Sequence, residues 1–337
     1  MKLSKSLVLS FALLFLYLTG FTQDLHFSQY HLSPLALNPA NTGNYSGNWR
    51  ISNILRSQWQ QFADPGYQTL GIGGEIKADN VLKGLNIGGL VIHDRSGSVT
   101  MKVTKAMFSS SYKTLIGKSY LQVGLQAGLI FKQFNNAIYG TQFNWGTGQF
   151  DSSLPSMEDG IDESINFFDL NAGVLWKRRF GWIEPEIGLA FFHLNTPKEG
   201  FTGSSEKLEI RSMYSLSARI ILNQKFNVSP ICYYQRIQMT ENLLGGIQIR
   251  YNLERNPNQI NYITMGTMIR SGFKRQTDAA IISLGVSVNK YLIGISYDAN
   301  ISDIQAYTNS VGAFELGVVY TGFTSRFNPN SLPCSRE

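Results

Sequence analysis

Few residues in this sequence have the types and spacing that catalysis or metal binding requires. The chain has four histidines, and none stands in an H-E-x-x-H or mixed Cys/His spacing. These are His26, His31, His93 and His193. Residues 294–298, GISYD, begin like the nucleophile elbow G-x-S-x-G but lack its final glycine. The sequence therefore predicts no metal site, and we interpret Ser296 as a small side chain on the wall of a β-structure.

Two further motifs resemble ligand-binding loops but lack the surrounding sequence that such loops need. Residues 71–75, GIGGE, precede no helix, so they do not form a nucleotide-binding loop. Residues 157–164, MEDGIDES, cluster acids without the spacing of an EF-hand, which leaves weak calcium binding or a solvated loop. A hydrolase would need a Ser/His/Asp group at one rim, and the sequence offers no such set. We therefore predict that the protein is not an enzyme and has no catalytic residue and no cofactor.

The first residues have the pattern of an export signal. Lys2 and Lys5 precede an apolar run over residues 7–18, and the small residues Gly20 and Thr22 suit a cleavage site. The apolar run is short for a membrane-spanning helix, although an uncleaved anchor is the alternative. We expect a signal peptide over residues 1–22 and an exported mature chain.

Charge and cysteine content exclude two further classes of protein. Without Lys2 and Lys5 the formal charge falls from +6 to +4, and residues 177–179 form the only basic block. Nucleic-acid binding is therefore not expected. Cys232 and Cys334 are the only cysteines, so a disulfide framework does not hold this exported chain together.

The dominant pattern is alternation of apolar and polar residues with a period of two, as in residues 121–131, LQVGLQAGLIF. About fourteen such segments, many of about ten residues, have the length that a tilted strand needs to cross a bilayer. They lie near residues 49–58, 67–78, 84–93, 99–112, 119–132, 166–177, 182–193, 207–221, 226–237, 242–253, 259–270, 278–288, 291–299 and 311–323. The sequence predicts an all-β protein, an integral outer-membrane antiparallel β-barrel of about 14 strands after a cleaved signal peptide. A soluble exported sandwich or propeller is the alternative.

The connections between these segments alternate in length. If the first strand runs outward, the periplasmic connections are short and most outer ones are long, the longest being residues 133–165. An even strand count then leaves both termini in the periplasm. We divide the chain into a signal peptide (1–22), an N-terminal periplasmic or lumen-packed segment (23–48), a transmembrane barrel (49–323) and a periplasmic C-terminal tail (324–337).

Side-chain type indicates which face of each strand meets lipid. Aromatic residues near strand ends suit an interfacial girdle, namely Tyr112, Trp176, Trp182, Tyr251, Tyr262, Tyr291 and Tyr320. The inferred inner face carries charges of both signs: Glu75, Lys77, Lys132, Asp169, Glu184, Glu186, Glu209, Arg211, Arg219, Arg250, Asp298 and Glu315. Mixed signs fit a wall that pairs with itself or with an inserted segment, and they equally fit a wide hydrated lumen.

Residues 27–43, FSQYHLSPLALNPANTG, precede the first strand and suit neither helix nor strand. Proline restricts their backbone, and Asn-Pro and Asn-Thr-Gly form turns. The segment cannot face lipid, because its backbone groups would lack partners there. We expect it to fold against the inner wall or the periplasmic rim, although a floppy leader is the alternative. Its candidate partner or plug contacts are Phe27, Tyr30, Leu37, Asn38 and Pro39.

Several short motifs follow one another along the chain: FSQY and PLALNPANTG within residues 27–43, RSQWQQF at 56–62, FFDLNAGVLW at 167–176, FFHLN at 191–195, IGISYD at 293–298 and FELGVVY at 314–320. Together they resemble one family, the PorP/SprF outer-membrane proteins of Bacteroidota. They cover essentially the whole mature chain. The chain ends in PCSRE and not in the family's Cys-Pro-Arg and aromatic residue, so no role is assigned to its last residues.

The resemblance implies a barrel in outer-membrane lipid that works with the type IX secretion system. Its expected partners are a secreted cargo protein, bound through its C-terminal domain, and periplasmic secretion-ring proteins. Its expected role is to assist secretion or cell-surface attachment of a cargo such as a gliding adhesin. A passive porin or a fatty-acid-type transporter is the alternative function.

Overall fold

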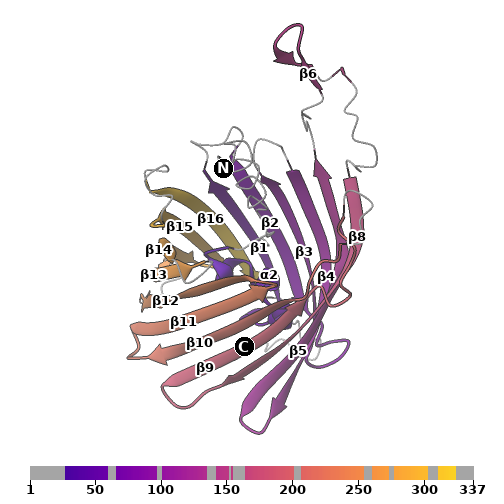
Figure 1. Ribbon diagram of the computed structural model, residues 1–337. Coiled ribbons are helices and arrows are strands. Elements are labelled where there is room, and N and C mark those ends of the chain that lie inside the picture. The colour runs from indigo at the N-terminus through magenta and orange to yellow at the C-terminus, as the bar shows by residue number, and fades with distance from the viewer. Residues whose placement is uncertain are drawn as a thin grey trace, which may run out of the picture.

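Fourteen long antiparallel strands close into one barrel in the computed structural model of the protein (Figure 1). The structure describes residues 27–59, 66–96, 101–134, 142–151, 153–154, 164–200, 206–253, 260–272, 277–302 and 310–323. The strands are β1 (Trp49–Gln58), β2 (Tyr67–Lys77), β3 (Leu85–Ser96), β4 (Met101–Ile116), β5 (Ser119–Phe134), β8 (Ser164–Arg178), β9 (Ile183–Phe192), β10 (Arg211–Ile221), β11 (Phe226–Ile237), β12 (Thr240–Asn252), β13 (Ile260–Ser271), β14 (Thr277–Val288), β15 (Tyr291–Asn300) and β16 (Val311–Gly322). The predicted fold class and strand number are confirmed.

The first and last strands close the barrel. β1 pairs with β16 along its whole length, from Trp49 opposite Gly322 to Gln58 opposite Ala313. Each strand otherwise pairs with its neighbours in sequence, except that β8 follows β5. Between these two strands, β6 (Phe143–Asn144) and β7 (Gln149–Phe150) form a separate small hairpin. Sequence analysis placed only a long loop there, because two-residue strands show no alternation.

Some strand boundaries differ from the predicted ones. β4 continues to Ile116, whereas β10 begins only at Arg211 and not at residue 207. Residues 207–210 lie outside the barrel wall, and Lys207 instead forms an isolated bridge with Lys198. The expectations for residues 1–22 and 324–337 concern parts of the chain outside the described residues.

The two ends of the barrel differ in their connections. One end, which we call the short-turn end, joins strands through tight turns such as residues 117–118 and 289–290. Gly117 and Asn289 at these turns have φ values of 60° and 53°, the left-handed backbone that tight turns require. The opposite end, the long-loop end, carries longer connections, such as residues 193–210, and the β6–β7 hairpin.

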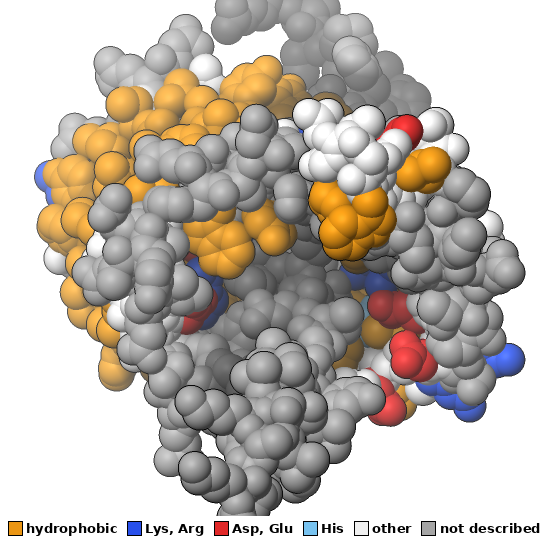
Figure 2. Space-filling model, turned by 45° about the horizontal axis from the view of Figure 1, so that its top comes forward, with side chains coloured by type: hydrophobic (Ala, Val, Ile, Leu, Met, Phe, Trp, Pro, Cys, Tyr) orange, Lys and Arg blue, Asp and Glu red, His pale blue; other side chains and the backbone are white. Residues whose placement is uncertain are grey.

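The outer surface of the barrel is apolar, as orange side chains over the wall show in Figure 2. Outward positions on mid-strand carry large apolar residues such as Leu125, Ile282 and Leu316, which are 58%, 56% and 38% exposed. Such a surface is favourable in hydrocarbon and unfavourable in water. Closure leaves no sheet edge that lipid would have to satisfy at these positions. The helices that the structure describes are all too short and too polar to span a bilayer.

Aromatic residues gather at the short-turn end. Trp49, Tyr291 and Tyr320 pack together on the outer face, with ring centroids 5.0 Å apart for Trp49–Tyr320 and 4.8 Å apart for Tyr291–Tyr320. Tyr262, predicted for the same girdle, shares the inner face of β13 with the buried Thr264. Its ring there stacks under the guanidinium of Arg250. The prediction for Tyr262 is therefore wrong, because the parity of β13 points this side chain into the lumen.

We predict that Ile282→Arg destabilises the barrel in a bilayer by about 2–4 kcal/mol, because it places a charge on the lipid-facing wall. Unfolding by urea in phospholipid vesicles measures the change. Val81→Arg is the matched control, since Val81 is 76% exposed in a connection at the short-turn end. Equal stability of the two variants would show that position 282 faces water.

Candidate functional site

The segment that precedes β1 lies inside the lumen. Residues 27–48, which we call the plug, contain three short helices, η1 (Tyr30–Leu32), α2 (Pro34–Leu37) and η2 (Pro39–Asn41). Figure 1 shows α2 inside the ring of strands. Plug side chains join apolar clusters on opposite parts of the wall. Leu35 packs with Leu90 of β3, and Leu37 packs against a cluster on β11–β14.

The plug runs along the lumen from one end of the barrel to the other. Ser28 contacts Arg56 and Asp298, which lie in the halves of β1 and β15 nearest the long-loop end. Gly43 contacts Glu75, near the short-turn end of β2. The chain then reverses at the short-turn end and rises again as β1.

Proline and asparagine shape this path. Pro34 begins α2 and Pro39 begins η2, positions where a missing N–H donor costs nothing. Between them Asn38 is extended, and its side chain accepts a hydrogen bond from the Ala40 N–H at 2.8 Å. The Thr42 hydroxyl donates to the Pro39 carbonyl at 2.7 Å. Each helix therefore stops after three or four residues, which keeps the plug compact.

Near the long-loop end, a buried group of charges holds the start of the plug. The backbone N–H groups of Ser28 and Gln29 each donate to one oxygen of the Glu315 carboxylate, both at 2.8 Å. Arg56 lies 2.6 Å from the same carboxylate and 3.1 Å from Asp298. Arg270 also binds Asp298, at 2.8 Å. We call these five residues, Ser28, Arg56, Arg270, Asp298 and Glu315, the latch.

The carboxylates of the latch are buried and paired. Two guanidinium groups face the Glu315 and Asp298 side chains, which are at most 1% exposed, and Arg270 also binds the more exposed Asp278 at 2.8 Å. The Ser28 hydroxyl adds a hydrogen bond to Asp298 at 2.7 Å. Removing one partner from such a group leaves an uncompensated buried charge, which costs about 3–5 kcal/mol. The plug supplies two of the N–H donors that satisfy Glu315, so its position and the latch depend on one another.

A second anchor lies at the short-turn end. The Glu75 carboxylate accepts the Gly43 N–H at 2.8 Å and binds Arg50 at 2.6 Å. The carbonyl of Thr42 accepts hydrogen bonds from Gln122 at 2.5 Å and from the Ser111 hydroxyl at 2.7 Å. Three barrel strands besides β1 therefore fix the last turn of the plug. The segment is tied to the wall at both of its ends.

Glycines on the inner wall make room for the middle of the plug. A Cβ atom at Gly173 would lie 2.0 Å from the Asn38 side-chain oxygen, and one at Gly124 would lie 2.4 Å from the backbone of Pro39. The Asn38 amide donates to the carbonyls of Val174 and Leu189, both at 3.2 Å. Only a wall without side chains at these places lets the plug backbone approach so closely.

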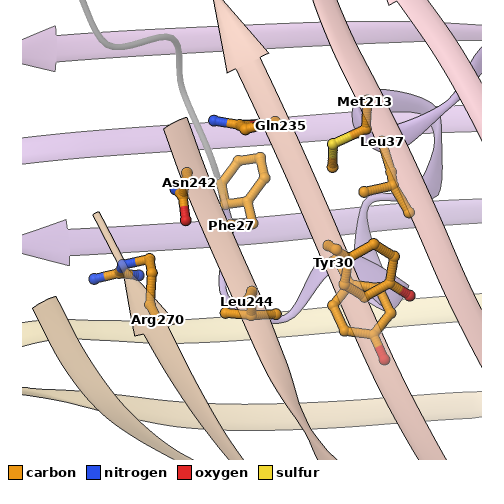
Figure 3. A pocket seen from close by; sticks show the side chains of 9 residues that line it. Phe27, Tyr30, Leu37, Met213, Gln235, Asn242, Leu244 and Arg270 are labelled. Carbon is orange, nitrogen blue, oxygen red and sulfur yellow. The ribbon is translucent and has the colours of Figure 1, made fainter. Parts of the chain in front are cut away.

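Apolar plug residues line a small pocket beside β10–β13 (Figure 3). The ring of Tyr30 stacks on that of Tyr233 with centroids 4.1 Å apart. Leu37 and Met213 lie next to this pair, and Phe27 lies between the polar side chains of Gln235, Asn242 and Arg270. The space between the lining side chains, with the open solvent at the mouth of the pocket included, is about 340 Å³. All five plug positions singled out in the sequence, Phe27, Tyr30, Leu37, Asn38 and Pro39, thus contact the wall, whereas a role in binding partners stays a prediction.

The three histidines that the structure describes do not form a common site. His31 lies in the plug, where burial and the nearby Arg250 lower its pKa to about 4, so it is neutral at pH 7. His193 is buried, with its Nδ1 2.8 Å from Asp169, whereas His93 is bound to Thr104 on the exposed outer face. His26 and residues 157–163 lie outside the described residues. In the described part of the chain, no group of three His, Cys, Asp or Glu side chains could hold a metal ion.

Most charges inferred for the inner face do face the lumen. The exception is Glu209, which precedes β10 and so lies outside the wall. The pairs Arg219–Glu184 and Lys177–Glu186 join neighbouring strands. Sequence analysis missed Arg50, Arg56 and Arg270, although each shares the parity of buried residues on its strand. That alternation was the available signal.

We predict that Glu315→Gln loosens the start of the plug, because Arg56 loses its closest counter-charge. The probe is Ser33→Cys in a chain with Cys232→Ser and Cys334→Ser, since Ser33 is 4% exposed. We expect maleimide to label this cysteine about 100-fold faster in Glu315→Gln, as 3 kcal/mol of opening would allow. Glu241→Gln on the exposed part of β12 is the control. An unchanged labelling rate would show that the latch does not hold the plug.

We predict that Gly173→Ala displaces Asn38 and exposes the middle of the plug, because the new Cβ overlaps the Asn38 side chain. Hydrogen exchange of the Ala40 and Asn41 amides should accelerate by about tenfold or more. Gly74→Ala is the matched control, since nothing lies within 4 Å of a Cβ built there. Equal exchange in the two variants would contradict this account of the glycines.

Comparison with solved structures found transporters of low similarity to this chain. The chain is similar in fold to the toluene transporter TodX of Pseudomonas putida, at 10% identity and a TM-score of 0.48, covering 89% of this chain and 95% of TodX. It is also similar to the toluene transporter TbuX of Ralstonia pickettii, at 10% identity and a TM-score of 0.46, covering 87% and 94%. No curated protein matches the chain.

A family model provides the more specific finding. The model described as "Type IX secretion system membrane protein PorP/SprF" matches residues 19–320. That range takes in the described plug and all but the last two residues of β16. The family and the barrel together place the protein in the outer membrane, in contact with its lipid. The chain belongs to the PorP/SprF family of type IX secretion system membrane proteins.

Proposed function

We propose that this barrel assists secretion or cell-surface attachment of a cargo protein, such as a gliding adhesin, by binding polypeptides and not by conducting solutes. The observation that carries the proposal is the plug, which occupies the lumen and is anchored at both ends by Glu315 and Glu75. Opening a water-filled path would break both anchors. Family membership supplies the secretion system in which such a barrel works.

The buried charges that hold the plug also support this proposal. The latch buries two arginines and two carboxylates, and the second anchor, at the short-turn end, buries Arg50 and Glu75 as a further pair. Buried ion pairs of this kind add little net stability but specify one arrangement strongly. A passive pore gains nothing from that specificity. A barrel that presents a fixed surface to protein partners does.

Electrostatics at the short-turn end support a protein partner there. Among the described inner-face residues of this end, six are cationic, namely Arg50, Lys77, Lys113, Lys177, Arg219 and Arg250, against Glu75, Glu184 and Glu186. Each of the three acids is already paired with one of these cations. The excess positive charge would attract an acidic surface. We propose that this end faces the periplasm and binds secretion-ring proteins. The barrel also binds the C-terminal domain of the cargo protein.

A second candidate function is transport of small apolar molecules. The pocket beside Tyr30 and Phe27 favours it, because its walls are mostly apolar with a few polar groups. Such a ligand would have to displace the latch or Tyr30 in order to pass further. Uptake assays with a fatty acid or a monoaromatic hydrocarbon distinguish this candidate from the first.

We predict that deleting the gene removes at least one cargo protein from the cell surface, and that the wild-type gene restores it. Quantitative proteomics of surface-labelled cells measures this effect. Purified barrel in planar bilayers should show no steady conductance, because the plug fills the lumen. Normal amounts of every surface protein together with normal gliding would overturn the proposal, and steady conductance with substrate uptake would favour the transporter.

A further inference from the structure

The barrel wall has a step where β9 ends before β8. β8 spans fifteen residues and pairs with β5 from Ser164 to Arg178, but it pairs with β9 only from Ala172 to Lys177. Figure 1 shows β4, β5 and β8 reaching higher than β9–β12. Within the described chain, residues 164–171 of β8 therefore have a strand partner on one side only. We call the other side of these residues the open edge.

The contacts of Leu170 show which backbone groups of β8 point toward the open edge. Leu170 accepts the N–H of Leu194 at 2.8 Å, and its own N–H donates to the side-chain oxygen of Asn195 at 3.1 Å. Because backbone groups alternate in direction along a strand, those of Phe168 and Asn166 point the same way as those of Leu170. The Phe168 carbonyl accepts the Asn195 amide at 2.6 Å. No described backbone group pairs with the Phe168 N–H or with either group of Asn166.

The Asn195 side chain takes the place of a neighbouring strand at one position of the open edge. After Asn195 the chain turns away from this edge. His193 has a φ of 61°, and its N–H and ring are held by Asn171 and Asp169 at 2.9 and 2.8 Å. This turn sends the following hairpin toward the lumen. There Glu199 binds Lys132, and Leu208 packs on the inward-facing cluster that contains Phe167. Beyond Asn195, the described part of the loop covers the inner face of β8 and makes no further hydrogen bond to its edge.

An edge of this kind can form hydrogen bonds with a partner of extended backbone. Lipid tails cannot satisfy N–H and C=O groups, and a row of them is a template for strand addition. The flanking side chains set the pattern of the partner. Phe168, Phe191 and Leu194 are exposed on the outer side, whereas Phe167 and Asp169 are buried on the inner side. A segment that alternates apolar and polar residues fits both sides.

We propose that the open edge, from Ser164 to Phe168, binds an extended segment of a partner polypeptide, which takes the place in the wall that a longer β9 would occupy. This is strand addition, in which backbone bonds supply affinity and alternating side chains supply selectivity. The inference deepens the proposed function and rests on it only for the expectation that the partner is a polypeptide. It assigns a site of contact at the long-loop end, distinct from the basic short-turn end.

Hydrogen exchange of the Asn166 and Phe168 amides tests the open edge. We compare the purified barrel in micelles with the complex isolated from native outer membranes through an affinity tag on this chain. The two amides should exchange quickly in the purified barrel and about 100-fold more slowly in the complex. Ile165 and Phe167, whose N–H groups face β5, are internal controls and should be protected in both samples.

A variant tests whether the edge holds the complex together. Asn166→Pro removes an N–H that faces the opening and spares the bonds to β5, and proline is tolerated on edge strands. It should reduce co-isolation of the partner at least tenfold, whereas Asn166→Ala should leave it unchanged. Heat-modified migration on gels checks that both variants remain folded. If Asn166→Pro does not fold, the exchange comparison decides alone.

Three outcomes would overturn the inference: fast exchange of both amides in the complex, slow exchange in the purified barrel, or a complex that contains only second copies of this chain. Cells carrying Asn166→Pro separate this inference from the proposed function. If they assemble the complex normally while gene deletion still removes cargo, the open edge is wrong and the proposed function stands. If gene deletion leaves every surface protein in place, the proposed function itself fails.

Discussion

The need to pair every backbone group away from water governs this structure. In hydrocarbon an N–H or C=O group without a partner costs several kcal/mol, so a sheet that spans lipid must close. The pairing of β1 with β16 at ten successive positions achieves that closure. Alternation then follows, because one face of the closed sheet meets lipid and the other meets the lumen. The step between β8 and β9 leaves the longest stretch, among the described strands, that has a strand partner on one side only.

Closure also creates an interior that the chain must fill. The inner wall carries buried charged and polar side chains as well as apolar clusters, so apolar packing alone cannot satisfy it. The plug solves this in two ways. Leu32 and Leu35 are fully or almost fully buried among apolar wall residues, while its backbone N–H groups satisfy Glu315 and Glu75. Gly124 and Gly173 let the two surfaces meet without side chains between them.

The strands could be predicted from the sequence because alternation is a local property of each segment. The plug could be predicted only as a segment that must avoid lipid. Its direction, from the long-loop end to the short-turn end, depends on contacts between residues that are far apart in the chain. The latch shows the same limit. Glu315 and Asp298 were placed on the inner face, but Arg56 and Arg270 were not, and nothing local indicates that these four side chains meet.

The step at the end of β9 lay beyond sequence analysis for a related reason. Residues 207–210 belong to the predicted strand 207–221, yet they leave the wall, because the preceding loop turns at His193. A shift of one residue in the register of a strand moves each of its side chains to the other face. The inward position of Tyr262 on β13 shows how a side chain can be assigned to the wrong face in this way. Sequence patterns therefore determine the number of strands more reliably than the places where each one stops.

The sequence separation within the latch has a consequence for the order of folding. Ser28 lies near the start of the described chain and Glu315 lies on the last strand, 287 residues away. The first part of the plug cannot take its final place until β16 has joined β1. Contacts between such distant residues form late, since the loop between them must close first. The latch thus couples the final position of the plug to completion of the wall. A barrel that lacks its last strand would also lack Glu315, and the start of the plug would not be held in the lumen.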